Sequence, residues 1–386
     1  MLKKIVKWIG LAFLALNVLT LLSGNRFIYK AIYYNFVNID DYKIFDNRSI
    51  PASKTPKPWS ISTAYNKKPL TDSLVATLEK YKSVAFLVIK NDSLIAEKYW
   101  KGYGEKSISN SFSMAKSVVS MLVGAAIKDG YIKSVNQPVA DFLPEFKEGE
   151  KVKITIKHLL QMSSGLDFDE SKSYKNPVSV FFSDIMVAYY GSDLYQLVAT
   201  KSPVEAPGVY FDYKSGDTQL LAFIVMKAVN KNLSEYFYEK IWNPIGAETE
   251  ALWCLDRENG FEKAFCCINS NARDFARLGK LYLNKGNAFG LQVVDTSYVE
   301  ASINGSGLID KLDTTKICDF YGYQWWMMPN YKEQNIFYLR GTLGQMVIVI
   351  PEKNIIIVRL GEEQGPKQGS HYAQIYSLVD EVNTMY

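Results

Sequence analysis

A serine and a lysine lie three residues apart, at Ser113 and Lys116, where a strongly apolar stretch begins. Residues at this spacing share one face of a helix, with Cβ atoms about 5–6 Å apart. A serine hydroxyl needs an adjacent base to become a good nucleophile, and a lysine can serve when partial burial lowers its pKa. The N–H groups of a helix N-terminus also suit a developing oxyanion. The pair therefore predicts a nucleophilic serine with a lysine base.

The simpler interpretation is a serine that caps a helix and a lysine that faces solvent. The surroundings of Lys116 argue against it, because a lysine on an otherwise apolar helix is uncommon without a reason. Its neighbours in the sequence are Met114, Ala115, Val118 and Val119.

Few residues are present that could support a histidine triad or a metal site. The chain has two histidines, His158 and His371, and neither stands in a context typical of catalysis. The four cysteines lack the short paired spacings of a zinc site. We therefore expect a base other than histidine and no metal. For Cys266 and Cys267, pairing with each other requires strain, so pairing of one with Cys254 and free buried thiols both stay open.

Tyr213 and Ser215 lie in a loop that follows Pro207-Gly208 and precedes an apolar helix at 220–229. Loop side chains of this kind can point into a cleft, and a tyrosine phenolate beside an ammonium can act as a general base. A turn with a packed aromatic residue explains the same pattern when it is taken alone.

Arg340, Gly341 and Thr342 precede an apolar strand at 346–350. Glycine at a strand edge lets a substrate backbone approach, and exposed N–H groups there can complete an oxyanion hole. A β-bulge or tight turn is the simpler alternative.

The elements expected to position these residues form two groups. Hairpin patterns lie at 84–100 and 345–360, at opposite ends of the folded region, and a mostly helical block separates them. We expect an α+β fold with one antiparallel sheet built from both ends of the domain, covered by helices, plus a helical lobe at roughly 155–290. A cleft between lobe and sheet is the expected place for a site.

The chain has 386 residues, is 48% hydrophobic and carries a net charge of +4 without a long basic block. These values allow a large core and give no support to nucleic-acid binding. Residues 76–386 are expected to form the domain that carries the nucleophilic serine. Residues 31–75, which include Pro51, Pro56 and Pro58, are predicted to form a linker or wrapping arm.

Residues 1–30 resemble a targeting segment, because lysines at 3, 4 and 7 precede an apolar run that reaches residue 22. The run is just long enough to span a membrane, which favours a single-pass inner-membrane anchor. The flanking lysines favour a cytoplasmic N-terminus, which would leave the catalytic domain outside, in the periplasm. A cleaved signal peptide, leaving a periplasmic protein, is the alternative.

Together the motifs resemble the serine β-lactamase and penicillin-binding-protein superfamily, near the class C β-lactamases, carboxylesterases and 6-aminohexanoate-oligomer hydrolases. The likeness covers roughly residues 80–365 by motif order. Four segments carry it: Phe112-Ser-Met-Ala-Lys116-Ser, Thr155-Ile-Lys-His-Leu-Leu-Gln-Met-Ser-Ser-Gly165-Leu, Pro207-Gly to Gly216, and Asn271-Ala-Arg-Asp-Phe-Ala-Arg-Leu-Gly279.

The resemblance implies a role for each matching residue. Ser113 would be acylated, and Lys116 would help to deprotonate it and relay protons. Tyr213 would protonate the leaving group and activate the deacylating water. The N–H groups of Ser113 and Thr342 would form the oxyanion hole, and His158 would be structural. The family also implies the fold expected above and no cofactor.

The third motif departs from the family pattern. Where β-lactamases and peptidases carry a Lys-Thr-Gly that binds the substrate carboxylate, this chain has Leu339 in place of the cation, with Arg340 next to it. This departure, with Tyr-x-Ser at 213–215, favours an esterase or amidase for small or peptide-like substrates over efficient β-lactam turnover. The rival hypotheses are a non-hydrolytic binding protein or sensor of the envelope, and an exported structural protein in which the motifs are accidental.

Overall fold

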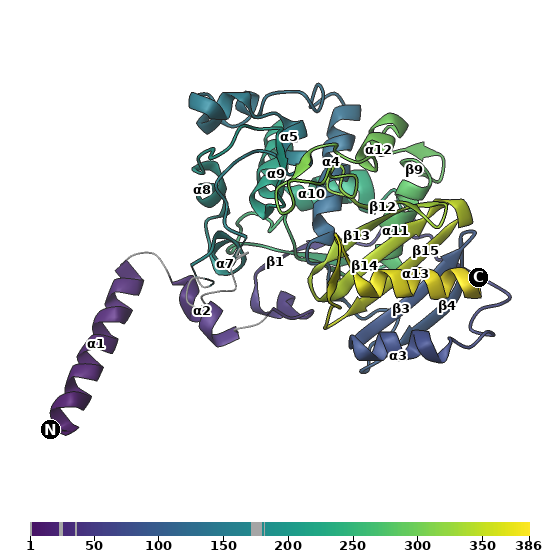
Figure 1. Ribbon diagram of the computed structural model, residues 1–386, viewed down its shortest axis with the longest axis horizontal. Helices are drawn as coiled ribbons and strands as arrows, with labels where there is room; N and C mark the ends of the chain where they lie inside the picture. The colour runs from purple at the N-terminus through teal and green to yellow at the C-terminus, as the bar shows by residue number, and fades with distance from the viewer. Residues whose placement is uncertain (1, 23–25, 35–36, 171–179, 181) are drawn as a thin grey trace.

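A seven-stranded sheet lies at the centre of the computed structural model, which describes residues 2–22, 26–34, 37–170, 180 and 182–386 (Figure 1). All neighbouring strands run antiparallel except β2 and β4. The strand order is β12 (Trp326–Tyr331), β13 (Gln334–Gly341), β14 (Gln345–Ile350), β15 (Ile355–Gly361), β3 (Ser83–Lys90), β4 (Ser93–Tyr99) and β2 (Ser60–Ile61).

The two ends of the domain meet in this sheet where β3 pairs with β15, with Val88 opposite Ile357. The central strands are nearly continuous apolar runs, because both of their faces are covered. The turn between β3 and β4 uses Asn91 and Asp92 at positive φ, which is the backbone that a tight two-residue hairpin requires. The predicted α+β fold, with a sheet built from both ends, is confirmed.

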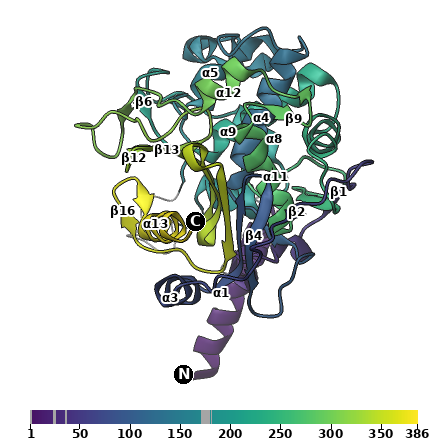
Figure 2. The ribbon, with the colours of Figure 1, turned by 90° about the vertical axis from the view of Figure 1, so that its right-hand side faces the viewer.

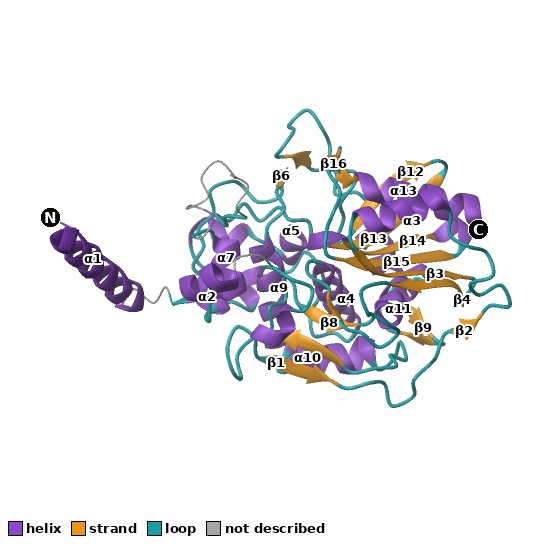
Figure 3. Cartoon of the chain, turned by 90° about the horizontal axis from the view of Figure 1, so that it is seen from below, coloured by secondary structure: helices purple, strands orange, loops and turns teal. Residues whose placement is uncertain are grey.

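Helices cover both faces of the sheet (Figure 3). On one face α3 (Asp72–Lys80) and α13 (Ala373–Met385) pack against a core layer that includes Val88. On the other face α4 (Met114–Lys128) and α11 (Ala272–Leu283) pack against a layer that includes Leu87. Adjacent strand residues thus point into different layers, as the period of two requires.

The helical lobe beside the sheet surrounds α9 (Ser215–Val229), which packs against α4. Within the described part of the lobe, its other α-helices are α5 (Ile156–Leu160), α7 (Asp184–Tyr190), α8 (Leu194–Ala199) and α10 (Leu233–Phe237). A small sheet joins it, in the order β1 (Asn47–Ile50), β7 (Ala251–Cys254), β8 (Ile268–Ser270) and β5 (Ser109–Asn110). Shorter elements are β6 (Tyr210–Phe211), β9 (Asn287–Ala288), β10 (Leu291–Gln292), α12 (Thr296–Ser302), β11 (Ile309–Asp310), β16 (Lys367–Gln368) and β17 (His371–Tyr372).

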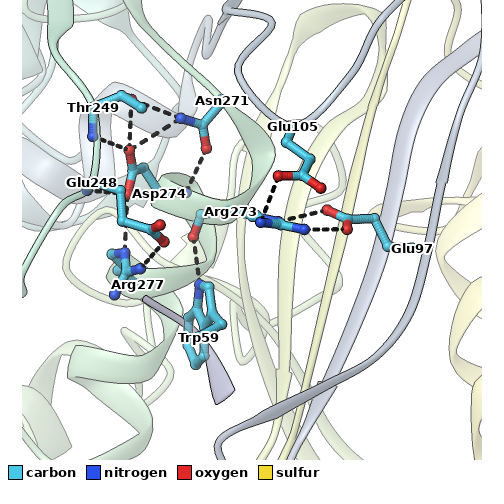
Figure 4. Close-up of polar contacts among 9 residues, drawn as sticks. All are labelled: Trp59, Glu97, Glu105, Glu248, Thr249, Asn271, Arg273, Asp274 and Arg277. Carbon is cyan, nitrogen blue, oxygen red and sulfur yellow. Dashed lines mark hydrogen bonds and ion pairs between the residues drawn. The ribbon is translucent and has the colours of Figure 1, made fainter. Parts of the chain in front are cut away.

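A polar network fastens α11 between the lobe and the sheet (Figure 4). Asn271 caps the helix by accepting the N–H of Asp274 at 2.8 Å. The Asp274 carboxylate accepts both the N–H and the hydroxyl of Thr249 from the lobe. Arg273 forms a two-bond ion pair with Glu97 of β4, at 2.6 and 2.8 Å. The segment 271–279 therefore joins two parts of the core.

The N-terminal helix α1 (Leu2–Leu22) projects away from the body and is followed by α2 (Phe27–Tyr34) (Figures 1 and 2). No helix of the described residues is long and apolar enough to cross a membrane. The lysines occupy the first two turns of α1, so the apolar part runs only from Trp8 to Leu22, about 22 Å against a hydrocarbon core of about 30 Å. The predicted single-pass inner-membrane anchor within residues 1–30 is therefore wrong.

Candidate active site

Ser113 stands directly before the first residue of α4, at the end of a tight turn. Phe112 has a left-handed backbone (φ 44°), and its N–H donates to Asn110 Oδ1 over 2.8 Å. Gly341, at the end of β13, lies against this turn, since a Cβ there would overlap the carbonyl oxygen of Ser111. This close packing places the third predicted motif beside the serine. It also explains the glycine at position 341 by contact with the nucleophile turn, whereas the sequence had suggested the approach of a substrate backbone.

Lys116 lies one helical turn further on, and its side chain is 1% exposed. Its Nζ donates to Ser113 Oγ at 3.1 Å and to the carbonyl oxygen of Phe265 at 2.8 Å. Burial lowers the pKa of Lys116 to about 8, and the nearby Glu170 carboxylate opposes that shift. About half of the amine is therefore neutral near pH 8, and its Nζ is directed at the serine hydroxyl.

Tyr213 lies across the site, with its ring centroid 5.1 Å from Lys116 Nζ. Burial raises the pKa of Tyr213 well above its usual value, and a hydrogen bond with Ser113 offsets part of the shift. Glu170 also raises the pKa of Tyr213, whereas Arg340 lowers it. The phenol thus stays protonated at neutral pH, which suits a proton donor better than the phenolate base considered from the sequence.

The turn at residues 162–165 holds the loop that carries Tyr213. The carbonyl of Met162 accepts the N–H of Asp212 at 2.8 Å, and its sulfur lies 3.4 Å from the N–H of Lys214. Gly165 has a positive φ of 72°, and a Cβ there would overlap the carbonyl oxygen of Glu205. Packing between distant loops, rather than a regular element, therefore fixes the tyrosine.

Ser215 and Thr342 have different surroundings. Ser215 is buried and begins α9, where its N–H donates to Glu170 Oε1. Thr342 is exposed and follows Gly341 at the sheet edge. The backbone carbonyl of Thr342 accepts a hydrogen bond from Gln345 Nε2 at 3.1 Å.

Arg340 lies between two aromatic rings. Its guanidinium carbon is 3.3 Å from the ring centroid of Trp326 and 4.9 Å from that of Tyr372, and Nη1 donates to the carbonyl of Ser370 at 3.2 Å. The Trp326 ring in turn packs at 5.6 Å against Tyr213. Because this stacking fixes the guanidinium plane, Arg340 can offer N–H groups to an anion at low entropic cost.

Three groups of the site were not foreseen from the sequence: Glu170, Asp217 and the carbonyl of Phe265. A carbonyl carries no sequence signal, and Glu170 gains its place through a contact with a residue 45 positions away. Asp217 could have been noticed, because it stands at the start of an apolar helix in the manner of Lys116.

The family model described as Beta-lactamase matches residues 71–378, most of the chain and all the segments described above. The chain belongs to the beta-lactamase family. A curated member of similar sequence, the 6-aminohexanoate-dimer hydrolase of Paenarthrobacter ureafaciens, is 28% identical over 300 residues, 75% of each protein. The teichoic acid D-alanine hydrolase of Staphylococcus aureus is 23% identical over 351 residues, 82% of this chain and 80% of that protein.

The fold is also found in solved structures. A candidate 6-aminohexanoate-dimer hydrolase from Bacillus anthracis superposes with a TM-score of 0.76 at 22% identity, covering 90% of this chain and 92% of that one. The superfamily resemblance inferred from the motifs is therefore confirmed, and the hydrolase names of these relatives agree with the predicted enzyme class.

The histidines and cysteines of this beta-lactamase-family chain lie outside the Ser-Lys-Tyr cluster. His158 closes a capping box with Thr155 at the start of α5, and the ring of His371 pairs with the Tyr338 hydroxyl at 2.6 Å. Burial lowers the pKa of His371 to about 4, so it is neutral at physiological pH. Cys266 and Cys267 form a disulfide, the pairing that their adjacency made least expected, while Cys254 and Cys318 are free and buried.

Proposed function

We propose that this protein is a serine hydrolase that cleaves an ester or amide through an acyl-enzyme on Ser113. The observation that carries the proposal is the buried amine of Lys116, 3.1 Å from the serine oxygen and with its pKa lowered to about 8. A buried, partly neutral lysine destabilises a fold, so its placement against a hydroxyl argues for use as a base.

The proposed reaction starts with neutral Lys116, which accepts the Ser113 proton as the oxygen attacks the substrate carbonyl. The N–H groups of Ser113 and Thr342 stabilise the resulting oxyanion. Tyr213 donates its proton to the leaving group and regains one from the Lys116 ammonium. In the second step the same Lys116 and Tyr213 pair accepts a proton from water as it attacks the acyl-enzyme, and a proton returns to the serine oxygen.

The proposed substrate is a small or peptide-like ester or amide. Leu339, which stands where the family has a cation, is fully buried in the core and cannot contact a substrate. Arg340, held against Trp326, is then the cation that the third motif itself supplies. Weak β-lactam turnover is expected for that reason. Both relatives described above are named for compounds that contain an amino acid unit. We therefore propose an ester or amide derived from an amino acid, with Arg340 and Ser215 among the groups that border it.

The first test is the intact mass of the protein after exposure to a fluorophosphonate, with Ser113→Ala as the matched control. We expect one adduct per chain on the wild type, mapped to Ser113, and none on the variant. A folded wild-type protein that takes up no probe would refute the nucleophile. It would instead favour the rival hypothesis, a non-hydrolytic binding role for the same residues, although the membrane anchor expected with that role is not supported.

A further inference from the structure

A buried arginine lies in the central sheet, opposite the start of β14. Arg359 belongs to β15 and is 1% exposed. Its Nη1 donates hydrogen bonds to the carbonyl oxygens of Leu343 and Gly344, at 2.8 and 2.9 Å. On the other side, Nε donates to Ser83 Oγ at 2.9 Å and Nη2 donates to the carbonyl oxygen of Tyr81. Among the described residues, the hydrogen bonds of this guanidinium all go to uncharged oxygens.

Packing does not explain an arginine at this position. Strand residues two apart face the same side of a sheet, and the residues two and four positions before Arg359 are Ile357 and Ile355, both fully buried. A buried cation without an ion-pair partner costs free energy, and apolar residues of similar volume often stabilise a core better. The use of Arg359 therefore lies in its hydrogen bonds, two of which go to one turn.

That turn, Thr342–Gly344, connects β13 to β14 and has an unfavourable backbone. Leu343 has a φ of 61°, in the left-handed region that a leucine rarely adopts. Such a conformation persists only where its surroundings hold it. Arg359 binds the carbonyls of the second and third residues of the turn, and the buried Gln345 binds the carbonyl of the first at 3.1 Å. Two buried side chains thus fix three consecutive peptide groups.

The turn borders the nucleophile. A Cβ at Gly341, the residue before the turn, would overlap the carbonyl oxygen of Ser111, so the turn begins against the loop that leads to Ser113. In the proposed reaction the N–H of Thr342 supplies half of the oxyanion hole. Such a donor works only when it is held in place beforehand, and a misplacement of about 1 Å can cost on the order of a hundredfold in rate.

We propose that Arg359, together with Gln345, positions the Thr342 N–H for stabilisation of the oxyanion. Arg359 acts through the turn, so it is a positioning residue. The inference rests on the proposed function and adds to it a residue outside the three motifs. A purely structural explanation has Arg359 tie β15 to the junction of α3 and β3. That explanation accounts for the bonds to Ser83 and Tyr81 but not for the two bonds to the turn.

The test is Arg359→Lys, which keeps the charge but replaces the planar fork by one ammonium that cannot hold both sides at once. The measured quantities are kcat/KM for isobutyryl p-nitroanilide or the p-nitrophenyl ester of the same acid, and the Ki of phenylboronic acid. The tetrahedral adduct of that boronic acid with a serine places an oxygen in the oxyanion hole. We expect kcat/KM to fall about ten- to a hundredfold and Ki to rise by a similar factor.

The matched control is Ile357→Ala, which weakens the same face of β15 opposite Ile348, away from the turn. It should lower the melting temperature and keep both constants of the folded protein at their wild-type values. A folded Arg359→Lys with wild-type kcat/KM and Ki would overturn the inference and leave the proposed hydrolase intact.

If Arg359→Lys shows no cooperative melting transition, Gln345→Met decides the question. It removes the amide that holds the Thr342 carbonyl at nearly constant size, and the same loss of kcat/KM and rise in Ki are expected. Wild-type constants in that variant would likewise overturn the inference. An absence of hydrolysis by the wild type, together with no fluorophosphonate adduct at Ser113, would overturn the inference and the proposed function together.

Discussion

The acid limb of the pH–rate profile should report the ionisation of Lys116. Its pKa is lowered to about 8 by burial. With that value about a tenth of the amine is neutral at pH 7 and about nine tenths at pH 9, so kcat/KM should rise about eight- to tenfold across this interval. The assay is hydrolysis of a neutral substrate such as isobutyryl p-nitroanilide, which has no group of its own that titrates in the range.

Glu170→Gln provides a second, directional check on the same limb. The Glu170 charge raises the pKa of Lys116, so its removal should lower that pKa and move the limb to lower pH. Glu352→Gln, which removes an exposed carboxylate in the turn after β14, should leave the limb in place. A wild-type profile that is flat between pH 6 and 9 would refute Lys116 as the base. If Glu170→Gln leaves the acid limb at the wild-type pH, the Glu170 charge has no measurable effect on the pKa of Lys116, and this part of the reasoning is refuted.

Two further substitutions test separate parts of the site. Tyr213→Phe removes the hydroxyl that we propose donates to the leaving group and supports deacylation. The value of kcat should then fall at least about a hundredfold, and intact mass should detect an acyl-enzyme that persists. Rapid clearance of the acyl group would contradict this role. Gly341→Ala places a Cβ against the carbonyl of Ser111, so the free energy of unfolding should drop by roughly 1–3 kcal/mol and probe labelling at Ser113 should slow; an unchanged melting curve would show that the turn has room.

The sequence predicted the sheet where its strands are long and apolar, and failed where they are short or interrupted. The strands β3, β14 and β15 read clearly because burial of both faces makes them continuous hydrophobic runs. The edge strand β12 was not foreseen, since it contains Pro329, a residue that strands tolerate mainly at sheet edges. The small sheet of the lobe was missed as well, because its strands of two to four residues come from segments far apart in the chain.

The same distinction holds for the site. Ser113 and Lys116 could be paired from the sequence because a helix brings residues three apart together. Tyr213 needed the resemblance of its loop, and Glu170 could not be found at all, because tertiary packing alone places it at the start of α9. The predicted membrane anchor failed for a related reason. The apolar run reached the required length only when the residues between its lysines were counted, and these do not form an uninterrupted apolar span.

Burial alone is enough to divide the catalytic roles between Lys116 and Tyr213. A site of low polarity favours the neutral form of each group, which lowers the pKa of the amine and raises that of the phenol. Once the pH exceeds about 8, the prevailing pair is a free base and an intact acid, with Lys116 Nζ 5.1 Å from the ring centroid of Tyr213. Because the pair is neutral, the fixed charges around it become the main electrostatic features that a substrate meets. Glu170 raises the pKa of Tyr213 and Arg340 lowers it, so these two charges oppose each other at the phenol and burial remains the main cause of its raised pKa.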